Sequence, residues 1–317
     1  MGKYTQLTQE QRYQISAFMK ANFSQTDTAQ KIGAHKSTIC RELKRNQGLK
    51  GYRPKQAHIM AVGRRKKALK FVKLTPPVVV LIDELIRFDF SPEQVSGFLK
   101  LNYDFQISHE TIYKHLLADK AKGGKLYNHL RHANKKRKKR YGFQDRRGQI
   151  HGRISIDKRP AIVDAKKRIG DWEIDTIIGK KHKSVLLTIV ERKSKLTLIK
   201  KLPNKRADLV ADAAFDLLVP YKKKVFTITA DNGKEFSHHE EISNRLKAEV
   251  YFAHPYHSWE RGLNENTNGL IRQYFSKTIS FETITDDQVQ MVIYRLNNRP
   301  RKILGFKTPN EVFFQIS

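Results

Sequence analysis

The 317-residue chain carries 62 Lys and Arg against 31 Asp and Glu, a formal net charge of +31. Such an excess of positive charge attracts polyanions at long range, so nucleic acid is the expected partner. No stretch approaches the roughly 20 apolar residues of a membrane span, and the N-terminus lacks a signal-peptide core, so we expect no membrane partner and a cytoplasmic location. The single cysteine, Cys40, excludes an internal disulfide and a cysteine-based zinc site.

The positive charge is concentrated in the first half of the chain. Residues 1–150 hold 32 Lys and Arg against 11 Asp and Glu, whereas residues 151–317 hold 30 against 20. The most basic stretch lies between the expected domains and consists of Lys135, Lys136, Arg137, Lys138, Lys139 and Arg140. Two interpretations stay open, because such a stretch is typical both of a solvated linker and of a segment that follows DNA phosphates without reading sequence.

The N-terminal residues predict a helix-turn-helix. A one-sided apolar stripe over 8–21 (Tyr13, Ile15, Phe18 and Met19) indicates a first helix, and a second is expected from about Gln25. Ala29, Gly33 and Ile39 then provide close helix approach, a left-handed turn and an inward β-branched residue. The recognition helix is expected over 36–45, with Ile39, Cys40 and Leu43 inward. Its outward, DNA-facing residues would be Lys36, Ser37, Arg41 and Lys44.

A second helical pair is predicted over 91–118. Ser91, Pro92 and Gln94 form a helix start with a capping box, and Ser108 caps the next helix. The expected inward residues are Val95, Phe98 and Leu99 on the first helix and Ile112, Tyr113 and Leu116 on the second. The outward residues of the second helix, candidates for DNA binding, would be His109, Thr111 and Lys114. Residues 78–86 predict a preceding helix. Because this pair is less basic and its turn is longer, a purely structural role stays open.

The second half of the chain changes to short β-branched runs. Residues 172–178, 184–190 and 196–199 predict a three-stranded antiparallel meander. A helix over 206–219, a strand over 225–229, a helix over 239–247, a strand over 249–253 and a helix from about Gly262 follow. This succession is the ribonuclease-H-like order. The expected fold is therefore α+β and multidomain, with helical DNA-binding regions followed by a ribonuclease-H-like catalytic domain.

Three acidic residues occupy informative positions in that order. Asp175 lies in an otherwise apolar strand, where an unpaired carboxylate would be costly, Asp231 ends the fourth strand, and Glu265 begins the last helix. Fifty-five residues separate the first two acids and 33 the last two, so only tertiary folding brings them together. We expect them to bind two Mg²⁺ ions, with Mn²⁺ as a substitute, that act on a phosphodiester.

Other polar residues near these acids are candidates for binding phosphate or metal. Arg272 lies two helical turns after Glu265 and is a candidate DNA-phosphate ligand. The pairs His254/His257 and His238/His239 raise the question of zinc, but no cysteine is nearby and a proline lies within the first pair, so we expect no zinc site. We expect His257, Ser258 and Trp259 to shape the loop that leads to Glu265.

Five motifs of the second half together resemble a known family. GDWEIDTIIG (170–179), TADNGKEF (229–236), SWERGLNENTNGLIRQYF (258–275), YRLNNRPRK (294–302) and TPNEVF (308–313) are similar to the catalytic domain of the IS-thirty family of bacterial insertion-sequence transposases. SQTDTAQKIGAHKSTICREL (24–43), SPEQVSGFL (91–99) and ISHETIYKHL (107–116) are similar to that family's two helix-turn-helix regions. The resemblance covers nearly the whole chain.

The resemblance implies an activity, a domain order and partners. The DDE triad falls at Asp175, Asp231 and Glu265, with Asp175 bridging two metal ions, and the reactions are cutting at the element's ends and joining to new DNA. The partners would be double-stranded DNA and further copies of this chain, with no nucleotide cofactor and a nucleoid-associated location. The expected domains are a helix-turn-helix at 1–50, a second at 75–120, a basic linker at 121–160 and the catalytic domain at 161–317.

Two alternatives share parts of this pattern. A metal-dependent nuclease that cuts without joining would have the same acids. A DNA-binding repressor would need only the helix-turn-helix half, with the triad incidental.

Overall fold

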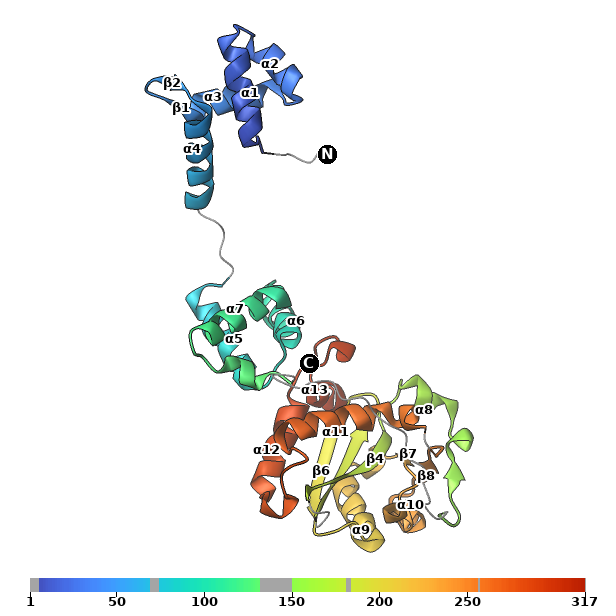
Figure 1. Ribbon diagram of the computed structural model, residues 1–317. Helices are drawn as coiled ribbons and strands as arrows, with labels where there is room; N and C mark the ends of the chain where they lie inside the picture. Colours follow the sequence, from blue (N-terminus) through green and yellow to red (C-terminus); the bar gives the residue numbers. More distant parts are fainter. Residues whose placement is uncertain (1–5, 69–73, 132–149, 181–183, 256, 317) are drawn as a thin grey trace. The chain divides into compact units, whose positions relative to one another are not determined.

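The computed structural model describes residues 6–68, 74–131, 150–180, 184–255 and 257–316, and the chain forms two compact units, residues 1–73 and 74–317 (Figure 1). Each unit has its own core, and each is described by itself. Within the described residues, no helix is long and apolar enough to cross a membrane.

The first unit is a small helical domain. Its elements are α1 (Gln9–Lys20), α2 (Gln25–Ile32), α3 (Lys36–Asn46), the antiparallel strands β1 (Gln47–Gly48) and β2 (Gly51–Tyr52), and α4 (Pro54–Lys67). Leu7, Ile15, Ala29 and Ile39 form the core. Gly33 ends α2 with φ +70°, a left-handed conformation that glycine adopts without strain, so the turn between α2 and α3 forms as predicted. Helix α4 packs against α1 and α3.

For two residues of this unit, the predicted inward position is wrong. Tyr13 is 50% exposed, and Cys40 is exposed as well. Their predicted place inside is taken by a buried ion pair, in which Arg12 Nε lies 2.7 Å from Glu42 Oε1. The Arg12 guanidinium also donates to the Leu7 carbonyl at 2.7 Å, and the Tyr52 hydroxyl donates to Glu42 at 3.2 Å. These hydrogen bonds compensate the burial of two charges at the junction of α1 and α3.

The second unit begins with a helical region that covers 74–131. It contains α5 (Pro76–Arg87), α6 (Pro92–Tyr103), α7 (His109–Ala121) and the 3₁₀ turn η1 (Leu126–His129). The Ser91/Gln94 capping box is confirmed, and Val95, Leu99, Ile112 and Leu116 are buried as predicted. Tyr113 is 44% exposed, so its predicted inward position is wrong.

A six-stranded sheet forms the centre of the rest of this unit (Figure 1). Its strands are β3 (Ile154–Ser155), β4 (Asp171–Ile178), β5 (Val185–Glu191), β6 (Thr197–Leu202), β7 (Thr227–Ala230) and β8 (Glu249–Phe252). The spatial order is β3-β8-β7-β4-β5-β6, with β4, β5 and β6 antiparallel and β7 parallel to both β4 and β8. This is the ribonuclease-H-like arrangement predicted above. β3, within the expected linker, adds a further parallel strand beside β8.

Helices cover both faces of the sheet. They are α8 (Ala161–Ala165), α9 (Ala207–Leu218), α10 (His239–Leu246), α11 (Gly262–Tyr274), α12 (Asp286–Asn297) and α13 (Pro309–Phe314). Six 3₁₀ turns connect these elements within the described residues: η2 (Ile156–Lys158), η4 (Val219–Lys224), η5 (Lys234–Phe236), η6 (Ser258–Arg261), η7 (Phe281–Thr283) and η8 (Lys302–Leu304). One core contains residues of α9 and α10, and another contains residues of α11 and α12. Every residue of β5 is buried, as expected of a strand covered on both faces.

Asp89 connects the helical region, residues 74–131, to two helices that pack on the sheet. This residue lies between α5 and α6 and is 8% exposed. Its carboxylate accepts a hydrogen bond from the Tyr274 hydroxyl at 2.9 Å and pairs with Arg295 and with His129 Nδ1, the latter at 3.1 Å. Because Tyr274 is the last residue of α11 and Arg295 lies on α12, these contacts connect the α5–α6 corner to both helices.

Candidate active site

Asp175 lies in the middle of β4, opposite Thr188 of β5. Its Oδ1 accepts a hydrogen bond from the Thr176 backbone N–H at 2.9 Å, and its Oδ2 accepts one from the Asn268 side-chain amide at 2.8 Å. The Asn268 carbonyl oxygen in turn accepts the Thr188 hydroxyl at 3.2 Å. The first acid is therefore held in one orientation by its own strand, the neighbouring strand and α11.

Asp231 and Asp175 are brought together by the parallel pairing of β4 and β7. Asp231 directly follows β7, and its Oδ1 accepts the Gly233 backbone N–H at 2.9 Å, which fixes the turn. Arg261 lies between the two acids: Nη1 is 3.5 Å from Asp175 Oδ1 and Nη2 is 3.4 Å from Asp231 Oδ2. One guanidinium thus spans two carboxylates that are separated by 55 residues in sequence.

Glu265 lies in the first turn of α11 and faces the same place. It lines a cavity of about 480 Å³ together with Asp175, Arg261, Asn268 and Arg272. The structure therefore brings Asp175 and Glu265 to one cavity, and Asp231, which does not line it, is joined to Asp175 through Arg261. The set of ligand atoms they offer is entirely carboxylate oxygen, which suits a hard divalent cation.

The electrostatics of the site favour a bound cation. Burial raises the pKa of Asp175 to about 6; the Asp231 charge raises it further, whereas Arg261 opposes the shift. Ionised Asp175 is consequently disfavoured unless positive charge is close by.

Arg261 and Asn268 are functional candidates that sequence reasoning missed. The sequence spacing indicates both, because Asn268 lies about one helical turn after Glu265 on α11 and Arg261 is the N-cap of that helix, four residues before Glu265. Arg272 also lines the cavity, as its two-turn spacing predicts. Its Nη2 donates to the Ile178 carbonyl at 2.7 Å, and burial lowers its pKa, so the side chain also anchors α11 to the end of β4.

The predicted recognition helix presents its cations to solvent. Lys36, Arg41 and Lys44 on α3 are exposed, and Ser37 is half-buried. Arg41 Nη2 donates to Ser37 Oγ at 2.8 Å, which holds the guanidinium along the N-terminal part of α3. Since the N-terminal residues of a recognition helix meet base edges, this location agrees with a reading role.

The outward residues of the second helical pair lie in the first half of α7. His109 and Lys114 are exposed, whereas Thr111 is half-buried and its hydroxyl is 2.9 Å from Ser108 Oγ at the helix cap. The basic residues 135–140 lie outside the described residues, so both interpretations given for them stay open.

The histidines set aside for zinc are close to carboxylates. Potential ligand atoms of His254, His257 and Glu260 all lie within 4.8 Å of one another. Both ring nitrogens of His254 are already engaged, Nδ1 with Glu260 at 2.8 Å and Nε2 with Asp157 at 2.9 Å, and these contacts raise the His254 pKa. Carboxylates therefore occupy both ring nitrogens of His254, and the expectation that His257, Ser258 and Trp259 shape the loop before Glu265 stays a prediction.

Comparison with known proteins decides the family. The pattern described as "Helix-turn-helix domain" matches residues 3–46, and that described as "Integrase core domain" matches residues 165–258. The chain is 47% identical to the transposase for insertion sequence element IS4351 of Bacteroides fragilis, over 98% of this chain and 96% of that protein. The chain belongs to the IS-thirty (IS30) family of insertion-sequence transposases.

Two further relatives agree. This transposase is 34% identical to the transposase for IS1086 of Cupriavidus metallidurans, over 99% of this chain and 96% of that protein. It is 34% identical to the transposase InsI for IS30A of Escherichia coli K12, over 96% of this chain and 82% of that protein. The resemblance and the fold predicted from the sequence are confirmed. The chain is a DNA-binding enzyme of the DDE polynucleotidyl transferase class that depends on a divalent metal ion.

Proposed function

We propose that this chain binds the terminal inverted repeats of an insertion sequence, cuts the DNA strands there and joins them to target DNA. The observation that carries the proposal is the placement of Asp175 and Glu265 at one cavity, with Arg261 joining Asp175 to Asp231. The three acids lie in the sequence motifs that resemble the catalytic domain of this transposase family.

Two Mg²⁺ ions are the proposed cofactor, with Mn²⁺ as a substitute. The donor chemistry fits, because no described residue that lines the cavity is a cysteine or histidine, and the acids supply hard oxygen ligands. Asp175 would contact both ions, and Asp231 and Glu265 would each contact one. Bound there, the ions supply charge stabilisation to the phosphoryl group and activate the attacking hydroxyl.

The neighbouring side chains prepare these acids for that task. Asn268 holds one oxygen of Asp175 and leaves its other oxygen toward Thr176 and Arg261. Arg261 places positive charge beside both Asp175 and Asp231 and favours the ionised form of Asp175. Arg272 and Lys277 line the same cavity and place further cations where a DNA phosphate would enter.

The proposed DNA contacts divide into two kinds. Residues of α3 would read base edges in the major groove: Lys36, Ser37, Arg41 and Lys44. His109, Thr111 and Lys114 of α7, together with Lys135 to Arg140, would position the protein on the backbone. Because an element has two ends that must reach one target, we propose that the chain acts as a homo-oligomer on DNA.

The experiment that tests the proposal separates binding, cutting and joining. Asp175→Asn, Asp231→Asn and Glu265→Gln should each abolish cutting of element-end DNA in Mg²⁺ and joining of a pre-cut end, with binding nearly intact. Asp212→Asn is the matched control, because Asp212 is an exposed acid of α9 that pairs with Arg245 and should keep full activity.

The same assay discriminates the alternatives. Cutting without joining of the pre-cut end would identify a nuclease, and binding with neither reaction in the wild type would identify a repressor. Wild-type cutting by any one triad variant would remove that residue from the proposed site.

A further inference from the structure

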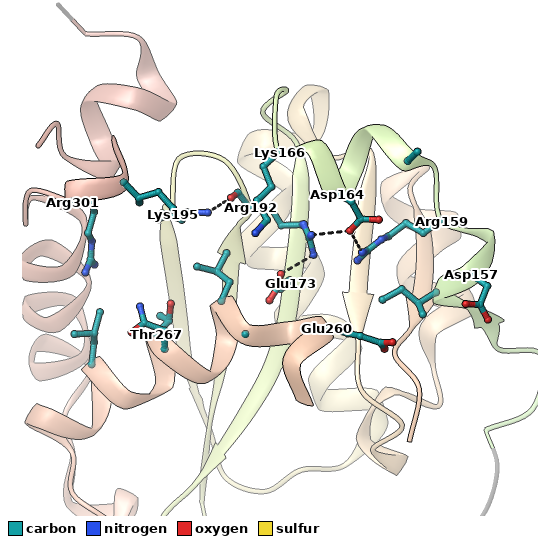
Figure 2. Close-up of a pocket in the computed structure, with 17 residues that line it drawn as sticks. Asp157, Arg159, Asp164, Lys166, Glu173, Arg192, Lys195, Glu260, Thr267 and Arg301 are labelled. Carbon is teal, nitrogen blue, oxygen red and sulfur yellow. Dashed lines mark hydrogen bonds and ion pairs between the residues drawn. The ribbon is translucent and has the colours of Figure 1, made fainter. Parts of the chain in front are cut away.

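A second cavity lies on the opposite face of α11 from the triad. It has a volume of about 760 Å³ and is bounded by the segment 156–166, β4, the turn between β5 and β6, α11 and the segment after α12 (Figure 2). Thr267 of α11 lines this cavity, whereas Glu265 and Asn268 line the catalytic one. One helix thus forms a wall of both.

Four acids line the second cavity, and each is already paired. Glu173 binds Arg192 at 2.8 Å and accepts the Asn264 backbone N–H at 3.2 Å. Asp164 pairs with Arg159 and, at 3.2 Å, with Arg192 (Figure 2). The remaining two, Asp157 and Glu260, bind His254. All four carboxylates that line this cavity are therefore engaged in ion pairs.

Three cations that line the cavity have no such partner. Among the described residues, no carboxylate lies within ion-pair distance of Lys166, Lys195 or Arg301. Lys195 Nζ donates only to a backbone carbonyl, that of Arg192. Arg301 Nη2 donates to the Leu296 carbonyl at 3.0 Å, while its buried Nε has no hydrogen-bond partner.

Holding these cations together costs free energy. Burial lowers the pKa of Lys195 to about 8, and the nearby Lys166 lowers it further. Burial also lowers the pKa of Arg301 to about 10, with Arg299 acting in the same direction. Both shifts report positive charge that is partly withdrawn from water, and for Lys195 the charges of Glu173 and Glu191 oppose the shift.

The backbone at both lysines is unusual as well. Lys166 has φ +52° and Lys195 has φ +68°, in the left-handed region that costs a residue with a Cβ some strain. Glycine would adopt either conformation freely, yet lysine occupies both positions. Lys166 is the C-cap of α8, and Lys195 lies in the turn between β5 and β6.

We propose that this cavity is a phosphate-binding subsite that holds the DNA backbone beside the catalytic site. Two lysines act as point charges and the arginine offers a planar fork of donors, a combination that suits phosphate oxygens. The inference rests on the proposed function only in taking DNA as the source of the phosphate. The site is separated from the triad by α11, so it would hold a different phosphate from the one that reacts.

The test compares two charge-matched double variants of the full chain. Lys166→Gln/Lys195→Gln removes two cavity cations, and Lys167→Gln/Lys193→Gln removes two neighbouring cations that do not line the cavity. Binding of duplex element-end DNA is measured in EDTA over a range of salt concentrations. The cavity variant should lower the slope of log affinity against log salt by about 1.8, two contacts at roughly 0.9 each. The control should change it by less than half that amount.

Equal slopes for the two double variants would overturn the proposal. A rise in melting temperature with inorganic phosphate that the cavity variant loses, with its DNA slope unchanged, would assign the cavity to a free phosphate compound and overturn the DNA source. If the glutamine variant fails to fold, Lys166→Gly/Lys195→Gly replaces it, because glycine accepts the positive φ. Binding in EDTA does not depend on cutting, so failure of the triad experiment leaves this result readable.

Discussion

Replacing Asp175 with asparagine should stabilise the metal-free protein at neutral pH although it abolishes activity. The pKa of Asp175 is about 6 in the folded chain against an ordinary value of 3.8, mainly because the side chain is buried. The folded protein therefore binds this proton more tightly than the unfolded chain does. Stability contributed by the protonated carboxyl is fully present below pH 3.8 and is lost as the pH rises through about 6.

The magnitude follows from that difference. A pKa that differs by about 2 units between the folded and unfolded states corresponds to about 3 kcal/mol of unfolding free energy. The side chain is 20% exposed, so little of this is discounted for solvent screening. At pH 8 in EDTA, Asp175→Asn should be about 3 kcal/mol more stable than the wild type, and near pH 4 the two should converge. In Mg²⁺ the wild type should recover, because the ion compensates the ionised acid.

Urea denaturation followed by tryptophan fluorescence measures this difference, because Trp172 lies within the residues that match the integrase core domain. Trp172 is fully buried on the same strand as Asp175, so its emission reports the unfolding of that strand. Asp212→Asn, an exposed acid, serves again as the control and should not stabilise the protein. Equal stability of Asp175→Asn and wild type at pH 8, or an equal gain at pH 4, would refute the reasoning.

Three further outcomes are expected. Glu42→Gln should destabilise the first unit by about 3–5 kcal/mol, because it leaves the charge of Arg12 buried and unpaired, and a circular-dichroism melt that matches wild type would contradict this. Arg41→Ala should weaken binding to element ends by about 1–3 kcal/mol more than binding to random DNA, measured by competition; equal losses would make Arg41 a phosphate contact. Replacing all six cations of 135–140 with glutamine should lower the salt slope by about two to five on every sequence alike, and an unchanged slope would leave a solvated linker.

The elements that carry the acids were predictable because their patterns are local. Asp175 is an acid within an apolar strand, and the turn at Asp231 and the helix at Glu265 follow from short-range signals. The role of Arg261 was not predictable, since it depends on how α11 lies across the ends of β4 and β7. The buried Arg12–Glu42 pair was missed because apolar periodicity assigns charged residues to the surface. β3 was missed because two residues show no periodicity, and only the pairing with β8 defines them.

The Asp89 contacts limit how this protein can be recombined with its relatives. Helix α11 holds Glu265 at one end and Tyr274 at the other, and at 1.5 Å per residue its 13 residues form a rod of roughly 20 Å. Asp89, in the helical region, accepts the hydrogen bond of the Tyr274 hydroxyl at the C-terminal end of α11. A chimera that imports residues 74–131 from another protein must therefore bring an acid at this corner. Without one, α11 loses this contact at its C-terminal end, and Glu265, the proposed catalytic acid at the other end, should lose its alignment.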